Sequence, residues 1–575
     1  MAQPANSAEL AGSFPVFLLE IAWEGRTYRF STYPVELAKA DGESVGFDGG
    51  LADPNLEERL ESMAADMESD GVQIEVVFPV DLVERLVVGG ISLETARGEL
   101  SMALERAGRI LNTYETRIRL VSGTVLQPII GDPGKPAGTA AFTLERNPLA
   151  DPVPMIPSAH RIPKRLFPDI PPYPNNNAFG KAWPIVIGSP GRNIPIPSGS
   201  AGIALSGVYA TPAYLIYRDS SSGTSPYWPH RLMIAGHAVE AASVQVEDYA
   251  GNTATLAVQT AAADTYGGLA SEAMIYSYVE FDFDADGLVT PSITGHETAS
   301  PEYWVQWLAG GGMSNPLGSG ELTYAGDVVR WALSLCRADV DLQAWLGRAA
   351  YLDSVAKFAG YINDPEVDAY TWLMDNILPY LPIEAVNGPD GIRPVAPVLS
   401  GGAYIMPSAS VETGEGWYIV GPIVTESEPD DLLNRVEVRF GLGGSGDFLS
   451  SYTLTGEAPR SQLDYFNASD EIARISRSRH GDRFEVVEPK YIHDLSSAAA
   501  VARYLVRRNA LTRRSLACVA DTAWGWLRIG DVVAVTSAAY HFSGHRFQIT
   551  AKSWEAGSWH FTLEIEENPA LQGRP

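Results

Sequence analysis

A proline-rich run between residues 145 and 200 constrains this 575-residue chain more than any other feature. The run includes NPLADPVPMIPSAHRIPKRLFPDIPPYPNNN, in which a proline recurs every few residues. Each proline removes a backbone hydrogen-bond donor and fixes φ, so this stretch suits neither a helix interior nor a central strand. We therefore expect residues 151–200 to run extended, either as a linker or as an arm laid on a neighbouring subunit.

The chain on either side of this arm predicts a mainly β protein with α+β insertions and several domains. Its length alone favours about four domains. We expect five units: a mixed β/α domain at 1–150, the arm at 151–200, a β-rich domain at 201–300, a helical and mixed domain at 301–425, and a β-barrel-like domain with one helix at 426–575.

Local patterns in the first unit predict both strands and helices. Residues 14–30 indicate two strands around a turn at Glu24-Gly25, and residues 72–79 and 116–125 indicate further strands. Residues 51–68 and 92–107 are predicted to be helices, the second with Ser92 as its N-cap.

The second half predicts a helical section followed by strands. Residues 324–382 carry apolar residues at helical spacing, with starts at Asp341 and Pro365, and their tryptophans favour a core over a ligand platform. Residues 494–515 predict a helix with Val501, Tyr504 and Leu505 on one face. Strands are expected at 435–440, 526–536, 545–555 and 558–567.

Charge and cysteine content exclude several functions. The chain has 41 basic and 70 acidic residues, a formal net charge of −29, which disfavours sequence-independent binding to nucleic acid or to an anionic membrane. Two cysteines cannot build a disulfide framework or a four-thiolate metal site. The start lacks a basic region, Glu20 interrupts its apolar run, and no stretch has the ~20 apolar residues of a membrane span. We expect a soluble protein made in the cytoplasm.

The segment VEFDFDADGL, residues 279–288, resembles half of a calcium-binding loop. Asp282, Asp284, Asp286 and Gly287 occupy the right positions, but position 12 is Ile293 instead of glutamate, and a strand precedes the loop. We therefore expect an exposed β edge or hairpin that ends in an Asp-Gly turn.

Other candidate motifs lack the context that their chemistry requires. The GLGGSG of residues 441–446 is followed by a strand-like segment, which favours a hairpin loop over a dinucleotide site. His541 and His545 have helical metal-site spacing but lie in a predicted β-hairpin, and His296-Glu297 has no second histidine. Cys336 and Cys518 are interpreted as small buried hydrophobes. A pair of catalytic carboxylates stays open among so many, but we predict no catalytic, cofactor-binding or metal-binding residue.

Four stretches resemble the tail hub proteins of tailed bacteriophages and gene transfer agents. They are FLLEIAWEGRTYRFSTYPVEL with the following GGL, NAFGKAWPIVIGSPGRNIPIP, the helical section from GDVVRWALSLCRADVDLQAW to GIRPV, and LSSAAAVARYLVRRNALTRR with WLRIGDVVAVT. The patterns are diffuse, but together they span most of the chain.

The resemblance implies two small β-barrel-like hub domains with inserted domains, assembled as a homotrimer at the distal end of a virion tail. Implied partners are distal tail and tail tube proteins, the tape measure protein, and tail fibre or receptor-binding proteins. Some such hubs carry a hydrolase domain or a metal cluster, but the motifs for these are missing here, so neither is expected, and no cofactor is expected.

Three alternatives stay open. The first is a distal tail ring or tail-tip adaptor of the same structural class. The second is a virion-associated cell-wall or polysaccharide hydrolase. The third is a glycan-binding module at residues 200–300.

Overall fold

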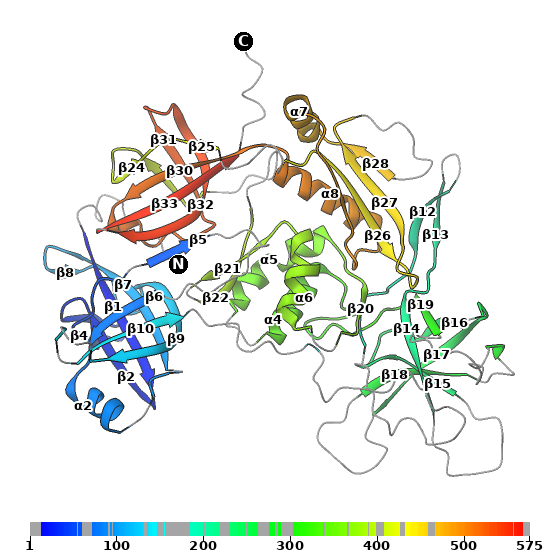
Figure 1. The fold of residues 1–575 in the computed structure, drawn as a ribbon, viewed down its shortest axis with the longest axis horizontal. Coiled ribbons are helices and arrows are strands. Elements are labelled where there is room, and N and C mark those ends of the chain that lie inside the picture. Colours follow the sequence, from blue (N-terminus) through cyan, green and yellow to red (C-terminus); the bar gives the residue numbers. More distant parts are fainter. Residues whose placement is uncertain are drawn as a thin grey trace.

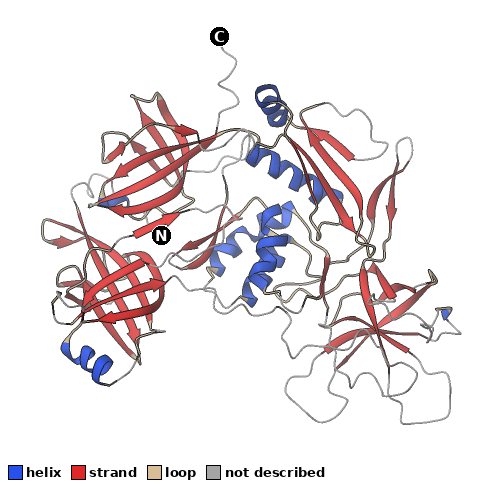
Figure 2. Cartoon of the chain, viewed as in Figure 1, coloured by secondary structure: helices blue, strands red, loops and turns tan. Residues whose placement is uncertain are grey.

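The computed structural model confirms a mainly β chain with several sheets, a closed barrel and a group of helices (Figures 1 and 2). It describes residues 13–54, 56–59, 72–89, 92–94, 96–131, 135–136, 138–145, 155, 184–198, 202–217, 230–248, 250–262, 275–281, 286–288, 303–336, 340–364, 367–388, 390–397, 407–425, 432–457, 466–555 and 557–566. Most of the proline-rich arm therefore lies outside the described residues.

The N-terminal sheet has nine strands in the order β3-β4-β2-β1-β7-β9-β10-β6, with β8 paired to β7. Its strands are β1 (Phe14–Trp23), β2 (Arg26–Ser31), β3 (Val35–Ala38), β4 (Ser44–Gly49), β6 (Val72–Val77), β7 (Arg97–Arg106), β8 (Arg109–Ile110), β9 (Ile118–Ile130) and β10 (Thr139–Glu145). A short helical segment, α2 (Val80–Val83) with the π-helix η1 (Glu84–Val88), follows β6. The predicted strand pair around Glu24-Gly25 is confirmed.

Two helix predictions in this region were wrong. The helix predicted at 92–107 is instead strand β7, and Ser92 accepts a hydrogen bond from the Glu94 amide in a turn. Strand β7 lies between β1 and β9, and residues 100–104 are buried on both of its faces. A continuous apolar run of this kind is hard to tell from a buried helix. Within the helix predicted at 51–68, Leu56–Arg59 form strand β5, and residues 60–68 lie outside the described part.

The C-terminal sheet has eight strands and takes in a strand from near the chain's beginning. Its order is β23-β31-β32-β33-β30-β24, with β25 on β30 and β5 on β32. The strands are β5 (Leu56–Arg59), β23 (Ala409–Glu412), β24 (Trp417–Ile419), β25 (Val424–Thr425), β30 (Arg513–Ala520), β31 (Val532–Ser537), β32 (Phe542–Glu555) and β33 (Ser558–Glu566), with the 3-10 turn η6 (Thr522–Trp524) between β30 and β31.

The N-terminal and C-terminal sheets share one hydrophobic core. Buried side chains of β1, β7 and β9 belong to the same cluster as those of β30, β32 and β33. The rings of Phe17 and Trp554 lie 5.4 Å apart at this junction, and strand β5 crosses it (Figure 1). The N-terminal and C-terminal sheets therefore pack as one unit.

A closed six-stranded barrel forms the part of the chain expected to be β-rich. Its order is β14-β15-β18-β17-β16-β19. The strands are β14 (Thr211–Tyr217), β15 (His230–Ala235), β16 (Ser243–Asp248), β17 (Thr253–Ala262), β18 (Ile275–Phe281) and β19 (Tyr303–Ala309), and the hairpin β12 (Ile194–Ser198) with β13 (Gly202–Ser206) precedes them.

Between the barrel and the shared core lies an α/β unit with its own core. Its helices are α4 (Ala325–Leu335), α5 (Leu342–Val355), α6 (Ala369–Asn376), η4 (Leu378–Tyr380), α7 (Glu471–His480) and α8 (Leu495–Asn509). Its strands are the hairpin β21 (Glu384–Gly388) and β22 (Gly391–Val395), and a four-stranded sheet of order β28-β27-β26-β29: β26 (Arg435–Leu442), β27 (Phe448–Thr455), β28 (Phe466–Ser469) and β29 (Phe484–Val487). We call these elements the helical unit.

Several helix predictions in this unit are confirmed. Asp341 caps α5 through a hydrogen bond from the Ala344 amide, as predicted. The other predicted start, Pro365, lies outside the described residues, and α6 begins after Asp368. The tryptophans at 331, 345 and 372 are buried in the core, as the spacing predicted. Residues 301–425 and 426–575 both contribute to this core and to the C-terminal sheet. The predicted domain boundaries stay predictions.

The described part of the aspartate segment agrees with its prediction at the turn but not at the strand. Residues 279–281 belong to β18, which pairs with both β15 and β17, so the expectation of a β edge was wrong there. Asp282 and Asp284 lie outside the described residues. Gly287 has a φ of +72°, the left-handed conformation expected of an Asp-Gly turn.

One short strand connects the barrel to the helical unit. Strand β11 (Ile185–Ile187) pairs with β20 (Gly360–Ile362). Successive side chains of a strand point to opposite faces. Val186 is buried in the barrel core and Ile187 in the core of the helical unit, each with 0% exposure. The barrel core and the core of the helical unit therefore meet on opposite faces of the three-residue strand β11.

The turn between β1 and β2 provides a test of backbone strain. Gly25 has a φ of +75°, and a methyl group there would contact nothing within 4 Å. Gly25→Ala should therefore destabilise the protein by about 1 kcal/mol through conformation alone. Gly46→Ala is the matched control, because that site is equally open but has no positive φ. Urea unfolding of both variants measures the difference, and equal midpoints would contradict the assignment of the turn.

Candidate functional site: a buried chain of charges

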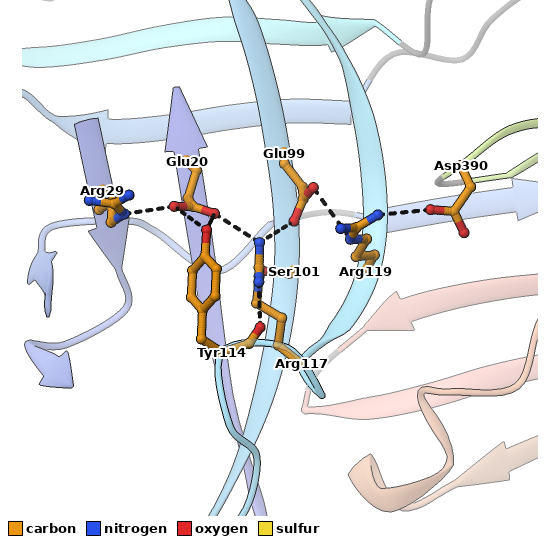
Figure 3. Close-up of polar contacts among 8 residues, drawn as sticks. All are labelled: Glu20, Arg29, Glu99, Ser101, Tyr114, Arg117, Arg119 and Asp390. Carbon is orange, nitrogen blue, oxygen red and sulfur yellow. Dashed lines mark hydrogen bonds and ion pairs between the residues drawn. The ribbon is translucent and has the colours of Figure 1, made fainter. Parts of the chain in front are cut away.

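Glu20 and Arg117 form the most buried ion pair of the N-terminal sheet. Arg117 Nη2 lies 2.9 Å from Glu20 Oε2, and the two side chains are 6% and 10% exposed. Arg29 Nε donates to Glu20 Oε1 at 2.7 Å. Tyr114 Oη donates to Glu20 Oε2 at 2.9 Å, and the Arg117 guanidinium lies over the Tyr114 ring (Figure 3). Strands β1 and β2 hold Glu20 and Arg29, and the turn before β9 brings Tyr114 and Arg117 to the same face.

The same arginine begins a line of alternating charges that leaves the sheet. Arg117 Nη2 also donates to Glu99 Oε1 at 2.7 Å, and Arg119 lies 3.5 Å from Glu99 Oε2. Arg119 Nη1 then donates to Asp390 Oδ1 at 3.0 Å, in the turn between β21 and β22 (Figure 3).

The line ends at the C-terminal sheet. Arg528, just before β31, lies 3.5 Å from Asp390 Oδ2. We call Arg29, Glu20, Arg117, Glu99, Arg119, Asp390 and Arg528 the charge chain. It connects the N-terminal sheet, the β21–β22 hairpin and the C-terminal sheet.

The environment of the charge chain favours a structural role over proton transfer. Both oxygens of Glu20 accept hydrogen bonds from arginine or tyrosine donors, so neither faces a substrate. Burial, followed by the hydrogen bond to Glu20, raises the pKa of Tyr114. Burial disfavours the charged form of Arg119, but Glu99 and Asp390 outweigh this and raise its pKa. Tyr114 therefore stays neutral as a hydrogen-bond donor, and Arg119 stays charged between its two carboxylates.

A cavity of about 350 Å³ lies between the helical unit and the barrel. Its inner wall includes Trp372, Tyr491 and His493, and Trp372 Nε1 donates to Tyr491 Oη at 2.9 Å. The Gly191 amide donates to His493 Nδ1 at 3.0 Å. Burial raises the pKa of Tyr491 to about 12. Because Trp372, Tyr491 and His493 already have hydrogen-bond partners within the protein, the cavity is interpreted as a seam between units.

The sequence candidates do not meet at one place. The GLGGSG loop joins β26 to β27 as a hairpin, as predicted. His541 lies in the turn between β31 and β32, and His545 lies within β32, so their predicted β context is confirmed. His296-Glu297 lies outside the described residues.

In the part of the chain that the structure describes, no group of three or more His, Cys, Asp or Glu could hold a metal ion. No described helix is long and apolar enough to cross a membrane.

Both cysteines are covered. Cys518 in β30 is 2% exposed, and Cys336 is partly covered at the end of α4. Burial raises the pKa of each thiol to about 12. The prediction of a buried hydrophobic group is confirmed for Cys518, whereas Cys336 is only partly buried.

Sequence reasoning missed the charge chain. Glu20 was visible as a charge inside an apolar strand, which is a signal for a buried partner. Arg117 and Asp390 carried no local signal, because their partners lie far away in the sequence.

Comparisons with known proteins add weak similarities to virion structures. No protein-family model matches the sequence, and no curated protein matches it. Among solved structures, the chain is similar to a chain of the virion of a native gene transfer agent particle, with 12% identity and a TM-score of 0.32 over 67% of this chain and 89% of that one. It is also similar to a chain of a topological model of the p2 virion baseplate in activated conformation, with 9% identity and a TM-score of 0.13 over 67% of this chain and 90% of that one. Likenesses this weak leave the function to be argued from the chain itself.

The buried part of the charge chain predicts a large loss of stability on truncation. Arg117→Met leaves Glu20 and Glu99 without their shared cation and should reduce the free energy of unfolding by about 3–5 kcal/mol. Arg474→Met is the control, since Arg474 pairs with Glu471 on the surface, where the side chains are 58% and 66% exposed. The control should leave the urea midpoint unchanged. Similar midpoints for the two variants would show that the charge chain does not brace the fold.

The raised pKa of the two thiols predicts that they react slowly with labelling reagents. At pH 8, a pKa of about 12 leaves the thiolate fraction roughly a thousand times lower than that of an ordinary cysteine. Ellman's reagent should therefore react with the native protein at least about 1000-fold more slowly than with free cysteine. Denaturing urea should release two thiols per chain. Fast labelling of the native protein would contradict the burial of at least one cysteine.

Proposed function

We propose that this chain is a structural protein of a tailed virion or gene transfer agent, and that it forms the central hub at the distal end of the tail. In this role it links the tail tube to the baseplate or tail tip. The observation that carries the proposal is the position in the fold of the four stretches that resemble hub proteins.

These stretches form the elements that hold the units together. The first supplies β1 and β2 of the shared core, and the described part of the second supplies β11, which contributes to two cores. The third supplies α4 to α6, and the fourth supplies α8 and β31. A family resemblance concentrated at junctions is expected when the arrangement of units, and not a local active site, is the feature that the family retains.

The internal bracing suits a part that transmits load between neighbours. The shared core joins the two ends of the chain, and the charge chain runs from the N-terminal sheet to the C-terminal sheet. A ring subunit must keep its units in fixed positions so that several copies close on themselves. The net charge of −29 supports a lumen past which DNA slides without binding.

The proposed partners follow from this place in a tail. A homotrimer would contact the distal tail and tail tube proteins on one side and tail fibre or receptor-binding proteins on the other, with the tape measure protein at its lumen. Assembly would take place in the host cytoplasm before the part is built into the virion.

The oligomeric state provides the first test. Three copies of the 62.0 kDa chain give a particle of about 186 kDa by light scattering, which is the expected result. A hexamer of about 372 kDa would instead favour the distal tail ring or tail-tip adaptor. Reconstruction of intact particles should place the chain at the distal end of the tail with threefold symmetry, and another location would contradict the proposal.

Activity measurements separate the remaining alternatives. The purified chain should not release sugars or peptides from peptidoglycan or host polysaccharide. Robust turnover that one carboxylate-to-amide substitution abolishes would establish a hydrolase instead. Specific signals on a glycan array that depend on the β14–β19 barrel would favour the glycan-binding module.

A further inference from the structure

The segment 184–191 holds the barrel against the helical unit by backbone contacts as well as by Val186 and Ile187. The Gly236 amide at the end of β15 donates to the Pro184 carbonyl at 2.8 Å, and the Gly188 amide donates to the Leu322 carbonyl at 2.9 Å. We call residues 184–191 the connecting segment. Two of its amides use histidine rings as acceptors.

His237 accepts the first of these hydrogen bonds. It follows β15 in the barrel, and its Nε2 accepts from the Val186 amide at 2.9 Å. Its Nδ1 faces the Ala238 carbonyl at 2.8 Å, which fixes the proton on Nδ1. The ring is partly covered by the surrounding protein.

His493 accepts the second hydrogen bond from the opposite side. It precedes α8 in the helical unit and is 7% exposed. Its Nδ1 accepts from the Gly191 amide at 3.0 Å. Each histidine therefore serves as an acceptor for the connecting segment, one from the barrel and one from the helical unit.

An imidazolium cannot make either contact. Protonation turns both ring nitrogens into donors, so the ring would then face the backbone amide donor to donor. Protonation would therefore remove a hydrogen bond at each end of the connecting segment, because each end donates to one neutral ring.

We propose that His237 and His493 form a proton-sensitive latch, whose protonation releases the connecting segment and loosens the barrel from the helical unit. The rest of the fold stays intact in this transition, since the shared core of the N-terminal and C-terminal sheets does not use these rings. The latch does not depend on the proposed place in a tail.

The pH window follows from the change in proton affinity on opening. Loss of hydration lowers the pKa of each ring from an ordinary 6.5 to about 4 in the closed state. An opened segment therefore binds more protons between these values, so the closed state loses stability as the pH falls from about 6.5 to about 4. At pH 5 the opening equilibrium should favour the open form about 20-fold more per histidine than at pH 7.

The charged groups around His493 act weakly on this balance. A hydrogen bond to the Lys490 backbone and the carboxylate of Asp494 favour the protonated ring, but loss of hydration outweighs them. Asp364 and Lys490 line the same cavity as His493. They carry opposite charges, so their effects on the ring oppose each other.

The surroundings of His237 contain fewer ionic groups. A hydrogen bond to the Ala238 backbone favours the protonated ring, and loss of hydration again outweighs it. Glu240, nearby in the same loop, accepts a hydrogen bond from Ser314.

Hydrogen exchange of the full chain tests the latch. Peptides that cover residues 184–191 are compared at pH 7 and pH 5, with rates corrected for intrinsic exchange. Their protection should fall by about 20-fold at pH 5 if one ring is released, and by up to about 500-fold if both rings are released in one opening. Protection of Phe14–Trp23 in the shared core serves as the internal reference and should change much less.

Two substitutions that keep the acceptor separate the latch from general acid sensitivity. His237→Gln places an amide oxygen near the position of Nε2, and His493→Asn places one near Nδ1, and neither takes up a proton in this range. The double variant should change less than about threefold between the two pH values.

His545→Asn is the matched control. His545 Nδ1 also accepts a backbone hydrogen bond, from the Ser543 amide at 3.0 Å, but it lies on the surface far from the connecting segment in the chain. It should leave the wild-type response unchanged.

Three results would overturn the latch. They are an unchanged response in the double variant, a wild-type segment equally protected at both pH values, or an equal fall in the reference peptide. If the double variant does not fold, His493→Asn alone and the wild-type comparison with the reference peptide still decide.

Discussion

The opposite burial of two neighbouring residues in strand β11 is the constraint on which the arrangement of units depends. Val186 belongs to the barrel core and Ile187 to the core of the helical unit. Burial of each side chain contributes about 1.5–3 kcal/mol. A shift of one residue in register would exchange their faces and place both in the wrong core. The close approach also explains Gly188 and Gly191, which have positive φ values and leave no room for a side chain against the facing backbone.

The N-terminal and C-terminal sheets are joined in a different way, by buried apolar area and by ion pairs. Apolar burial in the shared core stabilises the contact but does not depend on its exact orientation. The charge chain does depend on orientation, because each arginine must reach a carboxylate on a particular strand or turn. Buried ion pairs add little net stability compared with apolar packing, but an incorrect arrangement would leave a buried charge unpaired. We infer that the shared core provides most of the cohesion and that the charge chain selects one arrangement of the units.

Local features of the fold could be predicted from the sequence, and long-range ones could not. The β1–β2 turn, the cap of α5, the helix α8 and the GLGGSG hairpin are specified by residues within a few positions of each other. Strand β7 was misread because both its faces are buried, a fact that depends on β1 and β9. The charge chain was not predicted for the same reason, since Arg119 and Asp390 meet only after the N-terminal sheet and the helical unit have packed.

Strand β5 has a consequence for the synthesis of the protein. Leu56–Arg59 pairs with β32, which lies near the other end of the sequence. During translation this strand leaves the ribosome long before its partner exists, and Leu56, which is 3% exposed in the finished fold, stays open to water. An unpaired strand of this kind is a site for chaperone binding and for wrong association. A nascent chain that stops before β32 therefore leaves Leu56–Arg59 unpaired and exposed near its beginning. Cellular quality control can recognise an incomplete chain by this segment.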